Sequence, residues 1–188
     1  MSSNIILITG GSRSGKSSYA EKLYSHTNEV LYIATAIVTD KEMQDRINLH
    51  KQSRNQNWET AEQYKGLDQI VANTSKKNIL LDCVTVMVTN LMFDQETNEE
   101  KVNIQDLSLA ALEVLEQNII KEFRKLTKEV RARDKNIILV TNEVGYGLVP
   151  DYKLGRIFRD IAGRVNQQLA LLSDEVYLVS CGLPLKLK

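Results

Sequence analysis

The chain has 188 residues, of which 43% are hydrophobic and 26% charged, a composition typical of one soluble globular domain. Its 24 basic and 24 acidic residues give a formal net charge of zero, which argues against nucleic acid or an anionic membrane as a partner. No apolar run is long enough to cross a membrane, and the N-terminus lacks a signal-peptide pattern. Cys83 and Cys181 lie beside predicted strands, so we expect two small buried thiols and neither a metal pair nor a disulfide. These features predict a single domain over residues 1–188, located in the reducing cytoplasm.

The N-terminal segment predicts a phosphate-binding loop. Residues 4–9 form a short β-branched apolar run, which is typical of a buried strand. The residues that follow fit the pattern G-x-x-x-x-G-K-[ST], and they are Gly10, Gly11, Ser12, Arg13, Ser14, Gly15, Lys16 and Ser17. From Ser17 to His26, the spacing of Tyr19, Ala20 and Leu23 predicts a helix with one apolar face. An ordinary Gly/Ser-rich turn is the alternative, and the strand and helix patterns on either side disfavour it.

In a strand–loop–helix unit, each part of this pattern has a chemical role. The glycines let backbone N–H groups surround a polyphosphate, and the N-terminus of the helix adds partial positive charge. Lys16 reaches the outer phosphates, and the Ser17 hydroxyl binds Mg²⁺. The loop therefore predicts a protein that binds a nucleoside triphosphate.

Strand and helix patterns alternate along the rest of the chain. Strands are predicted at residues 29–34, 78–82, 136–141 and 175–180, with a short edge strand at 185–188. Helices are predicted over 40–54, 84–93, 107–130 and 154–172, and the polar stretch 94–106 predicts a solvated loop. The third of these helices has apolar residues at three- and four-residue steps, namely Leu112, Leu115, Ile119, Phe123, Leu126 and Val130. The alternation predicts an α/β, P-loop NTPase-type three-layer fold with a mostly parallel central sheet.

The ends of the predicted strands indicate where a ligand would bind. In an open parallel sheet, ligands gather at the carboxyl ends of the strands, so residues 9–10, 34–36, 82–83 and 141–143 are expected to meet at one site. Asp82 ends an apolar strand and is a candidate partner for Mg²⁺, because a P-loop enzyme requires an acidic group near its metal. The alternative is that Asp82 is the N-cap of the helix that begins at Val84, and one residue could fill both roles.

His50 is a candidate nucleophile. Residues four apart share a face of the helix predicted over 40–54, so Arg46 and Arg54 flank His50, with Lys51 adjacent. Two guanidinium groups suit phosphate, and they would lower the pKa of the imidazole and keep it neutral near pH 7. Such an imidazole could attack phosphorus and carry a covalent nucleotidyl group. The alternative is that His50 only packs on the apolar side of its helix.

Six segments together resemble the bifunctional adenosylcobinamide kinase/adenosylcobinamide-phosphate guanylyltransferase family of cobalamin assembly. They begin with GGSRSGKSSYAEKL at residues 10–23 and continue at 31–36, 40–62, 80–94, 141–150 and 155–170, which covers most of the chain in order. The most specific feature is a P-loop combined with R-I-x-x-H-x-x-x-R and then W-x-T, from Arg46 to Thr60. The resemblance implies two reactions. ATP or GTP phosphorylates a hydroxyl on the aminopropanol arm of adenosylcobinamide, and GMP then passes from GTP to that phosphate through a covalent GMP–histidine, giving adenosylcobinamide-GDP.

Matched by position, the resemblance implies that His50 carries GMP and that the loop from Gly10 to Ser17 holds the phosphates. It also implies nucleotide contacts at Ala34, Thr35, Ala36, Lys51, Gln52, Ser53, Arg54, Glu62 and Asp82. The chain departs from the family at Ser12, where Ala is common, and at Leu49, where a second histidine is common. The second departure removes an alternative nucleophile beside His50. The family further implies a homo-oligomer, with a trimer as the expected form.

Two other classes of function stay open at this point. The first is a P-loop small-molecule kinase in which His50 and Arg54 only clamp phosphate. The second is a nucleotide-dependent switch or binding module. Against the switch, residues 141–144 have the sequence TNEV, which differs from the N-K-x-D signature of guanine-specific switch proteins.

Overall fold

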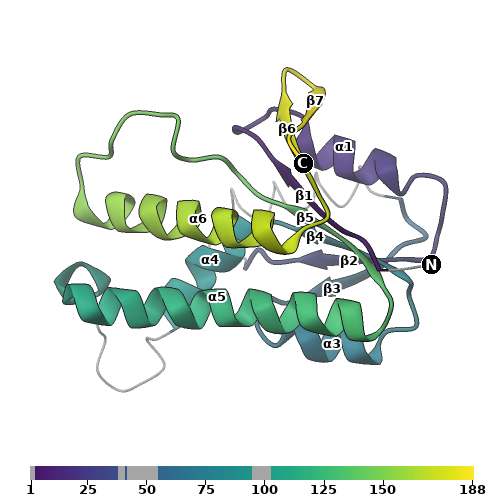
Figure 1. The fold of residues 1–188 in the computed structure, drawn as a ribbon, viewed down its shortest axis with the longest axis horizontal. Helices are drawn as coiled ribbons and strands as arrows, with labels where there is room; N and C mark the ends of the chain where they lie inside the picture. The colour runs from purple at the N-terminus through teal and green to yellow at the C-terminus, as the bar shows by residue number, and fades with distance from the viewer. Residues whose placement is uncertain (1–2, 38–40, 42–54, 95–102) are drawn as a thin grey trace.

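The computed structural model describes residues 3–37, 41, 55–94 and 103–188. In these residues a seven-stranded sheet has the order β3-β2-β4-β5-β1-β6-β7 (Figure 1). The strands are β1 (Ile5–Thr9), β2 (Val30–Ala34), β3 (Glu59–Glu62), β4 (Asn78–Asp82), β5 (Asn136–Val140), β6 (Glu175–Ser180) and β7 (Leu183–Lys186). All neighbouring strands pair in parallel except β7, which pairs antiparallel with β6. The predicted α/β fold with a mostly parallel sheet is confirmed.

Helices cover both faces of the sheet. They are α1 (Lys16–Leu23), α3 (Leu67–Asn73), α4 (Val84–Phe93), α5 (Leu109–Ala132) and α6 (Lys153–Leu172), with a short 3-10 helix η2 (Ile104–Asp106). Successive residues of the central strands pack on opposite faces. Leu7 of β1 packs in the cluster that contains Phe123 of α5, and Ile8 packs in the cluster that contains Ala20 of α1. Figure 1 shows α5 and α6 together on one side of the sheet, away from α1. In the described ranges, no helix combines the length and apolar character that a membrane span needs.

The long helix α5 illustrates how the sequence specifies an element. Ser108 precedes it as the N-cap, and its side chain accepts a hydrogen bond from the backbone N–H of Ala111 at 3.2 Å. The predicted apolar stripe is buried or partly buried against the sheet, with Phe123 only 2% exposed. The helical periodicity and the cap therefore agree, and the predicted helix is confirmed with its start at Leu109.

Several predictions about local structure need correction. β3 and α3 were not predicted, and the helix after the loop ends at Leu23, three residues before the predicted end. The stretch predicted as a solvated loop ends in η2, where Ile104 is buried against the core. Both cysteines are free, but Cys181 is exposed in the β6–β7 turn, so its assignment as a buried thiol is wrong. Apart from Lys41, the predicted helix over 40–54 lies outside the described residues.

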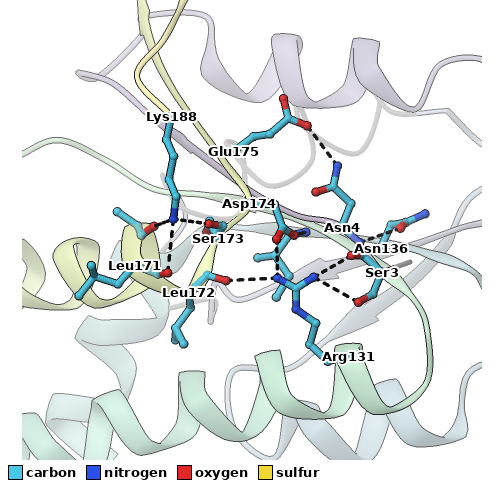
Figure 2. Close-up of polar contacts among 12 residues, drawn as sticks. Ser3, Asn4, Arg131, Asn136, Leu171, Leu172, Ser173, Asp174, Glu175 and Lys188 are labelled. Atoms are coloured by element: carbon cyan, nitrogen blue, oxygen red, sulfur yellow. Dashed lines mark hydrogen bonds and ion pairs between the residues drawn. The ribbon is translucent and has the colours of Figure 1, made fainter. Parts of the chain in front are cut away.

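Polar contacts fasten the amino ends of the strands (Figure 2). Arg131, in the last turn of α5, donates to the carbonyl oxygen of Ser3 at 2.7 Å and pairs with the Asp174 carboxylate at 2.8 Å. The second oxygen of Asp174 accepts the backbone N–H of Ile5 at 2.8 Å. Lys188 donates to carbonyl oxygens at the C-terminal end of α6. These structural contacts lie at the amino end of the sheet, opposite the carboxyl end at which the sequence predicts ligand binding.

Candidate nucleotide site

The predicted phosphate-binding loop connects β1 to α1 at the carboxyl edge of the sheet. The backbone turns sharply there, with positive φ at Arg13 (58°) and Gly15 (95°). A Cβ at Gly15 would lie 3.1 Å from the Cα of Gly182, and a Cβ at Gly10 would lie 2.4 Å from the carbonyl oxygen of Val179. A side chain at Gly15 would strain the backbone and crowd the β6–β7 turn, and a side chain at Gly10 would collide with the backbone of β6.

The loop is supported by segments far away in the sequence. The N–H of Gly182, in the β6–β7 turn, donates to the carbonyl oxygen of Ser14 at 2.9 Å. The N–H of Glu143, just after β5, donates to the carbonyl oxygen of Gly10 at 3.0 Å. Among the described residues, the hydroxyls of Thr9 and Ser14 are buried without a hydrogen-bond partner. Unpaired buried hydroxyls are rare in folded proteins and frequently mark places where a ligand or an ordered water completes the structure.

Lys16 is held in the middle of this loop. It is 8% exposed, and its Nζ donates to the carbonyl oxygen of Gly11 at 3.0 Å. Burial lowers the pKa of the Lys16 ammonium group, while the nearby Cys83 and Asp82 raise it. The loop thus presents a fixed, largely desolvated positive charge, which suits a polyphosphate.

Asp82 lies at the end of β4, beside Ala34 of β2 and Val140 of β5 in the sheet register. Its carboxylate accepts a hydrogen bond from the Tyr32 hydroxyl at 2.9 Å. The N-cap of α4 is Cys83, so the alternative assignment of Asp82 as that cap is wrong. A carboxylate held at a strand end within electrostatic reach of the P-loop lysine is suitably placed to serve a nucleotide site.

The donor set at this edge fits Mg²⁺ better than a transition metal. The Ser17 hydroxyl and the Asp82 carboxylate offer the hard oxygen ligands that Mg²⁺ prefers. In the described part of the chain, no group of three or more His, Cys, Asp or Glu side chains could hold a metal by itself. A magnesium ion here would therefore take its remaining ligands from phosphate oxygens and water, as is usual for this ion.

The predicted contacts at the end of β2 have structural partners. The Thr35 hydroxyl donates to the carbonyl oxygen of Cys83 at 2.8 Å and accepts the Cys83 N–H at 2.9 Å. Asn90 of α4 donates to the carbonyl oxygen of Thr35 at 2.7 Å. Thr35 thus joins the ends of β2 and β4 and is only 1% exposed, whereas Ala36 beside it is half-buried. Thr35 therefore stabilises the carboxyl ends of β2 and β4, where the candidate site lies.

Most of the predicted His50 region lies outside the described residues. This applies to Arg46, His50, Lys51, Gln52, Ser53 and Arg54. The description resumes at Asn55, and Trp58 is buried with its indole N–H donating to the carbonyl oxygen of Thr27 at 2.9 Å. Glu62 is exposed at the end of β3, next to Ala34 in register.

A pocket of about 340 Å³ lies beside the loop, at the ends of β4 and β5. Its lining comes from four segments and consists of Ser12, Thr85, Val86, Thr89, Asn142, Glu143, Val144 and Phe158. The strand-end rule predicted that residues 141–143 approach the site. The residues from α4 and α6 were not predicted, because only the packing of these helices brings them to the same edge.

A lysine held by the backbone of a glycine-rich loop, where a parallel strand leads into a helix, is the arrangement of the P-loop nucleotide-binding proteins. The chain has that fold. A solved structure from Pyrococcus horikoshii OT3, determined in the structural study of project PH0250, has a related fold with a TM-score of 0.52 at 8% sequence identity. The alignment covers 98% of this chain and 86% of the other.

Sequence comparisons identify the family within that class. The model of the CobU family, described as cobinamide kinase/cobinamide phosphate guanyltransferase, matches residues 6–187. The chain is 44% identical to the bifunctional adenosylcobalamin biosynthesis protein CobU of Escherichia coli K12, covering 98% of this chain and 99% of that protein. CobU of Salmonella typhimurium LT2 matches with the same identity and coverage. The protein CobP of Pseudomonas aeruginosa is 34% identical, covering 97% and 96%. The chain belongs to the cobinamide kinase/cobinamide phosphate guanyltransferase family, which confirms the resemblance seen in the sequence.

Proposed function

We propose that this enzyme carries out two successive reactions at its P-loop. It phosphorylates the hydroxyl of adenosylcobinamide with ATP or GTP, and it then transfers GMP from GTP to the new phosphate through a covalent adduct on His50. The observation that supports the proposal most directly is the preformed loop with Lys16 buried at its centre, in a chain of the cobinamide kinase/cobinamide phosphate guanyltransferase family.

In the kinase reaction the loop acts by positioning and by charge. Backbone N–H groups between Gly10 and Ser17 surround the phosphates, and the Lys16 ammonium stabilises the negative charge on the transferred group. Held by Ser17 and Asp82, a magnesium ion would neutralise further phosphate charge. Because the site is partly desolvated, each of these interactions is stronger than it would be in water.

In the guanylyl transfer, His50 is the proposed nucleophile. A ring nitrogen of neutral His50 attacks the α-phosphorus of GTP, the bond to the β-phosphate oxygen breaks, and pyrophosphate leaves with the electron pair. The phosphate oxygen of the acceptor then attacks the same phosphorus and releases His50. The spacing of Arg46 and Arg54 around His50 supports this role, because two guanidinium groups would orient the phosphates.

Labelling by GTP alone tests the covalent step. After incubation with GTP and Mg²⁺, the intact mass should increase by one GMP, and the adduct should be labile to acid and stable to base, as expected of a phosphoramidate. His50→Ala should abolish the adduct and the formation of adenosylcobinamide-GDP while retaining appreciable kinase activity. His26→Ala is the matched control, because His26 is the other histidine of the chain and is exposed beyond α1.

Two results would reject this mechanism. One is a His50→Ala enzyme that still makes adenosylcobinamide-GDP, and the other is a native protein that phosphorylates cobinamide without ever acquiring the adduct. The second result would favour a P-loop kinase that uses His50 only as a phosphate clamp. The expected homo-oligomer, a trimer, belongs to the same proposal and is measured by light scattering of the purified protein.

A further inference from the structure

Apart from Ser12, the residues that line the pocket beside the loop have no part in holding the nucleotide in the mechanism above. Its walls are formed by the first turns of α4, the segment after β5, residue Ser12 of the loop, and Phe158 of α6. Val86, Val144 and Phe158 give it apolar sides, and polar groups lie between them. A pocket of this character suits a small organic arm that carries one reactive polar group.

The sheet order brings this pocket to the phosphate site. β5 lies between β4 and β1, so the residues after β5 lie between Asp82 and the loop. The hydrogen bond from the Glu143 N–H to the carbonyl oxygen of Gly10, at 3.0 Å, fixes Glu143 directly against the start of the loop. A group bound in the pocket next to Glu143 is therefore adjacent to phosphates bound by the loop.

The polar residues of the pocket are held in place by their neighbours. The Asn142 side chain donates to the Thr85 hydroxyl at 2.6 Å, and the backbone carbonyl oxygen of Asn142 accepts from the Asn166 side chain at 3.1 Å. The Glu143 carboxylate accepts the N–H of Gly145 at 2.6 Å through one oxygen. No ion pair in the described part of the chain includes Glu143. Among the described residues, the contact with the Gly145 N–H orients this carboxylate, and no cation there forms an ion pair with it.

We propose that this pocket binds the alcohol-bearing arm of the kinase substrate and that Glu143 is the general base for its hydroxyl. The inference rests on the proposed kinase function. The alcohol oxygen forms a bond to the γ-phosphorus, its proton passes to the Glu143 carboxylate, and the bond from phosphorus to the β–γ bridging oxygen breaks with its electron pair leaving on the nucleoside diphosphate. Val86, Val144 and Phe158 pack against the carbon atoms of the arm.

The test separates the two reactions with the variant Glu143→Gln. Cobinamide phosphorylation should lose about 100-fold or more in kcat, the range of general-base catalysis, with little change in the KM for ATP. GTP self-labelling, which involves no alcohol, should stay within about threefold of wild type. Glu113→Gln is the matched control, because Glu113 is exposed on α5 away from the pocket, and it should leave both reactions unchanged.

A second variant keeps the test decisive if Glu143→Gln fails to fold. Val86→Phe narrows the pocket without touching the carboxylate, and it should raise the KM for cobinamide at least about tenfold while GTP labelling proceeds. Kinase activity of Glu143→Gln within about threefold of wild type, or parallel loss of labelling and phosphorylation in a folded variant, would overturn the inference. If wild-type enzyme phosphorylates no cobinamide, the proposed function itself fails.

Discussion

Replacing Lys16 by methionine should separate the contribution of this residue to catalysis from its contribution to folding. The Lys16 side chain is 8% exposed, and its ammonium group donates to the carbonyl oxygen of Gly11. Methionine keeps most of the buried stem but removes the charge. Loss of the charged hydrogen bond costs about 1.5–3 kcal/mol of stability. Burial disfavours the charged ammonium and lowers its pKa, so removing the charge also relieves an unfavourable desolvation that offsets a similar amount. The free energy of unfolding should therefore change by about 1 kcal/mol or less.

The effect of Lys16→Met on activity should be much larger. Removing one preorganised charge from a transition state typically costs about 2.7–4 kcal/mol, which corresponds to a 10²–10³-fold loss in rate. Both cobinamide phosphorylation and GTP labelling should fall by this factor, while urea unfolding and the melting temperature stay near wild type. Turnover within about tenfold of wild type would refute the assigned position of the phosphates. A melting temperature lower by more than about 8 °C would mean that the lysine acts mainly in folding.

Three further predictions concern Gly15 in the loop, Arg54, and Glu175 in the C-terminal strands. Gly15→Ala should destabilise the fold by about 1–3 kcal/mol and weaken nucleotide binding, because Gly15 has φ 95° and a Cβ there would meet Gly182; unchanged melting and affinity would contradict this. Arg54→Ala should weaken GTP binding and slow labelling without unfolding, and a lower melting temperature with normal labelling would make the residue structural. Hydrogen bonds from Lys186, Tyr177 and Asn4 lower the pKa of Glu175 from 4.5 to about 2. The ionised Glu175 carboxylate therefore stabilises the folded protein fully above pH 4.5, and this contribution is lost as the pH falls toward 2. The stability difference between wild type and Glu175→Gln, about 1 kcal/mol at neutral pH after solvent screening, should shrink over that range in urea titrations, and a constant difference would contradict it.

The parts of the fold that were predicted correctly are determined by residues that lie close together in the sequence. The run before the loop, the loop itself and the apolar face of α1 are all contained in residues 4–23, and the structure places them as predicted. By contrast, β3 has the sequence ETAE, whose residues are mostly exposed. It is a strand only because it pairs with β2 at the edge of the sheet. A short polar edge strand lacks the hydrophobic alternation that a sequence pattern needs.

The roles of individual polar residues were harder to predict because they depend on tertiary partners. Asp82 at a strand end suits both a metal site and a helix cap, and the structure gives the cap position to Cys83. The Thr35 hydroxyl joins β2 to the backbone of Cys83, a structural role that the sequence did not indicate, and its contact with nucleotide stays a prediction. Ile104 lies in a polar stretch and is nevertheless buried, since one apolar residue can anchor a connection without producing any periodicity.

The phosphate-binding loop shows most clearly why a motif and a site are different things. The motif is eight residues long, yet its backbone is held by the Glu143 N–H at Gly10 and by the Gly182 N–H at Ser14. These contacts come from the end of β5 and from the β6–β7 turn, and they exist only because β1 lies between β5 and β6 in the sheet. The same strand order that fixes the loop brings Glu143 against it, so support of the phosphates and access of an acceptor alcohol follow from one arrangement. A substitution that loosens the β6–β7 turn should therefore impair both reactions. A substitution on the pocket wall outside the loop, such as Val86→Phe, should impair only the reaction that uses the alcohol.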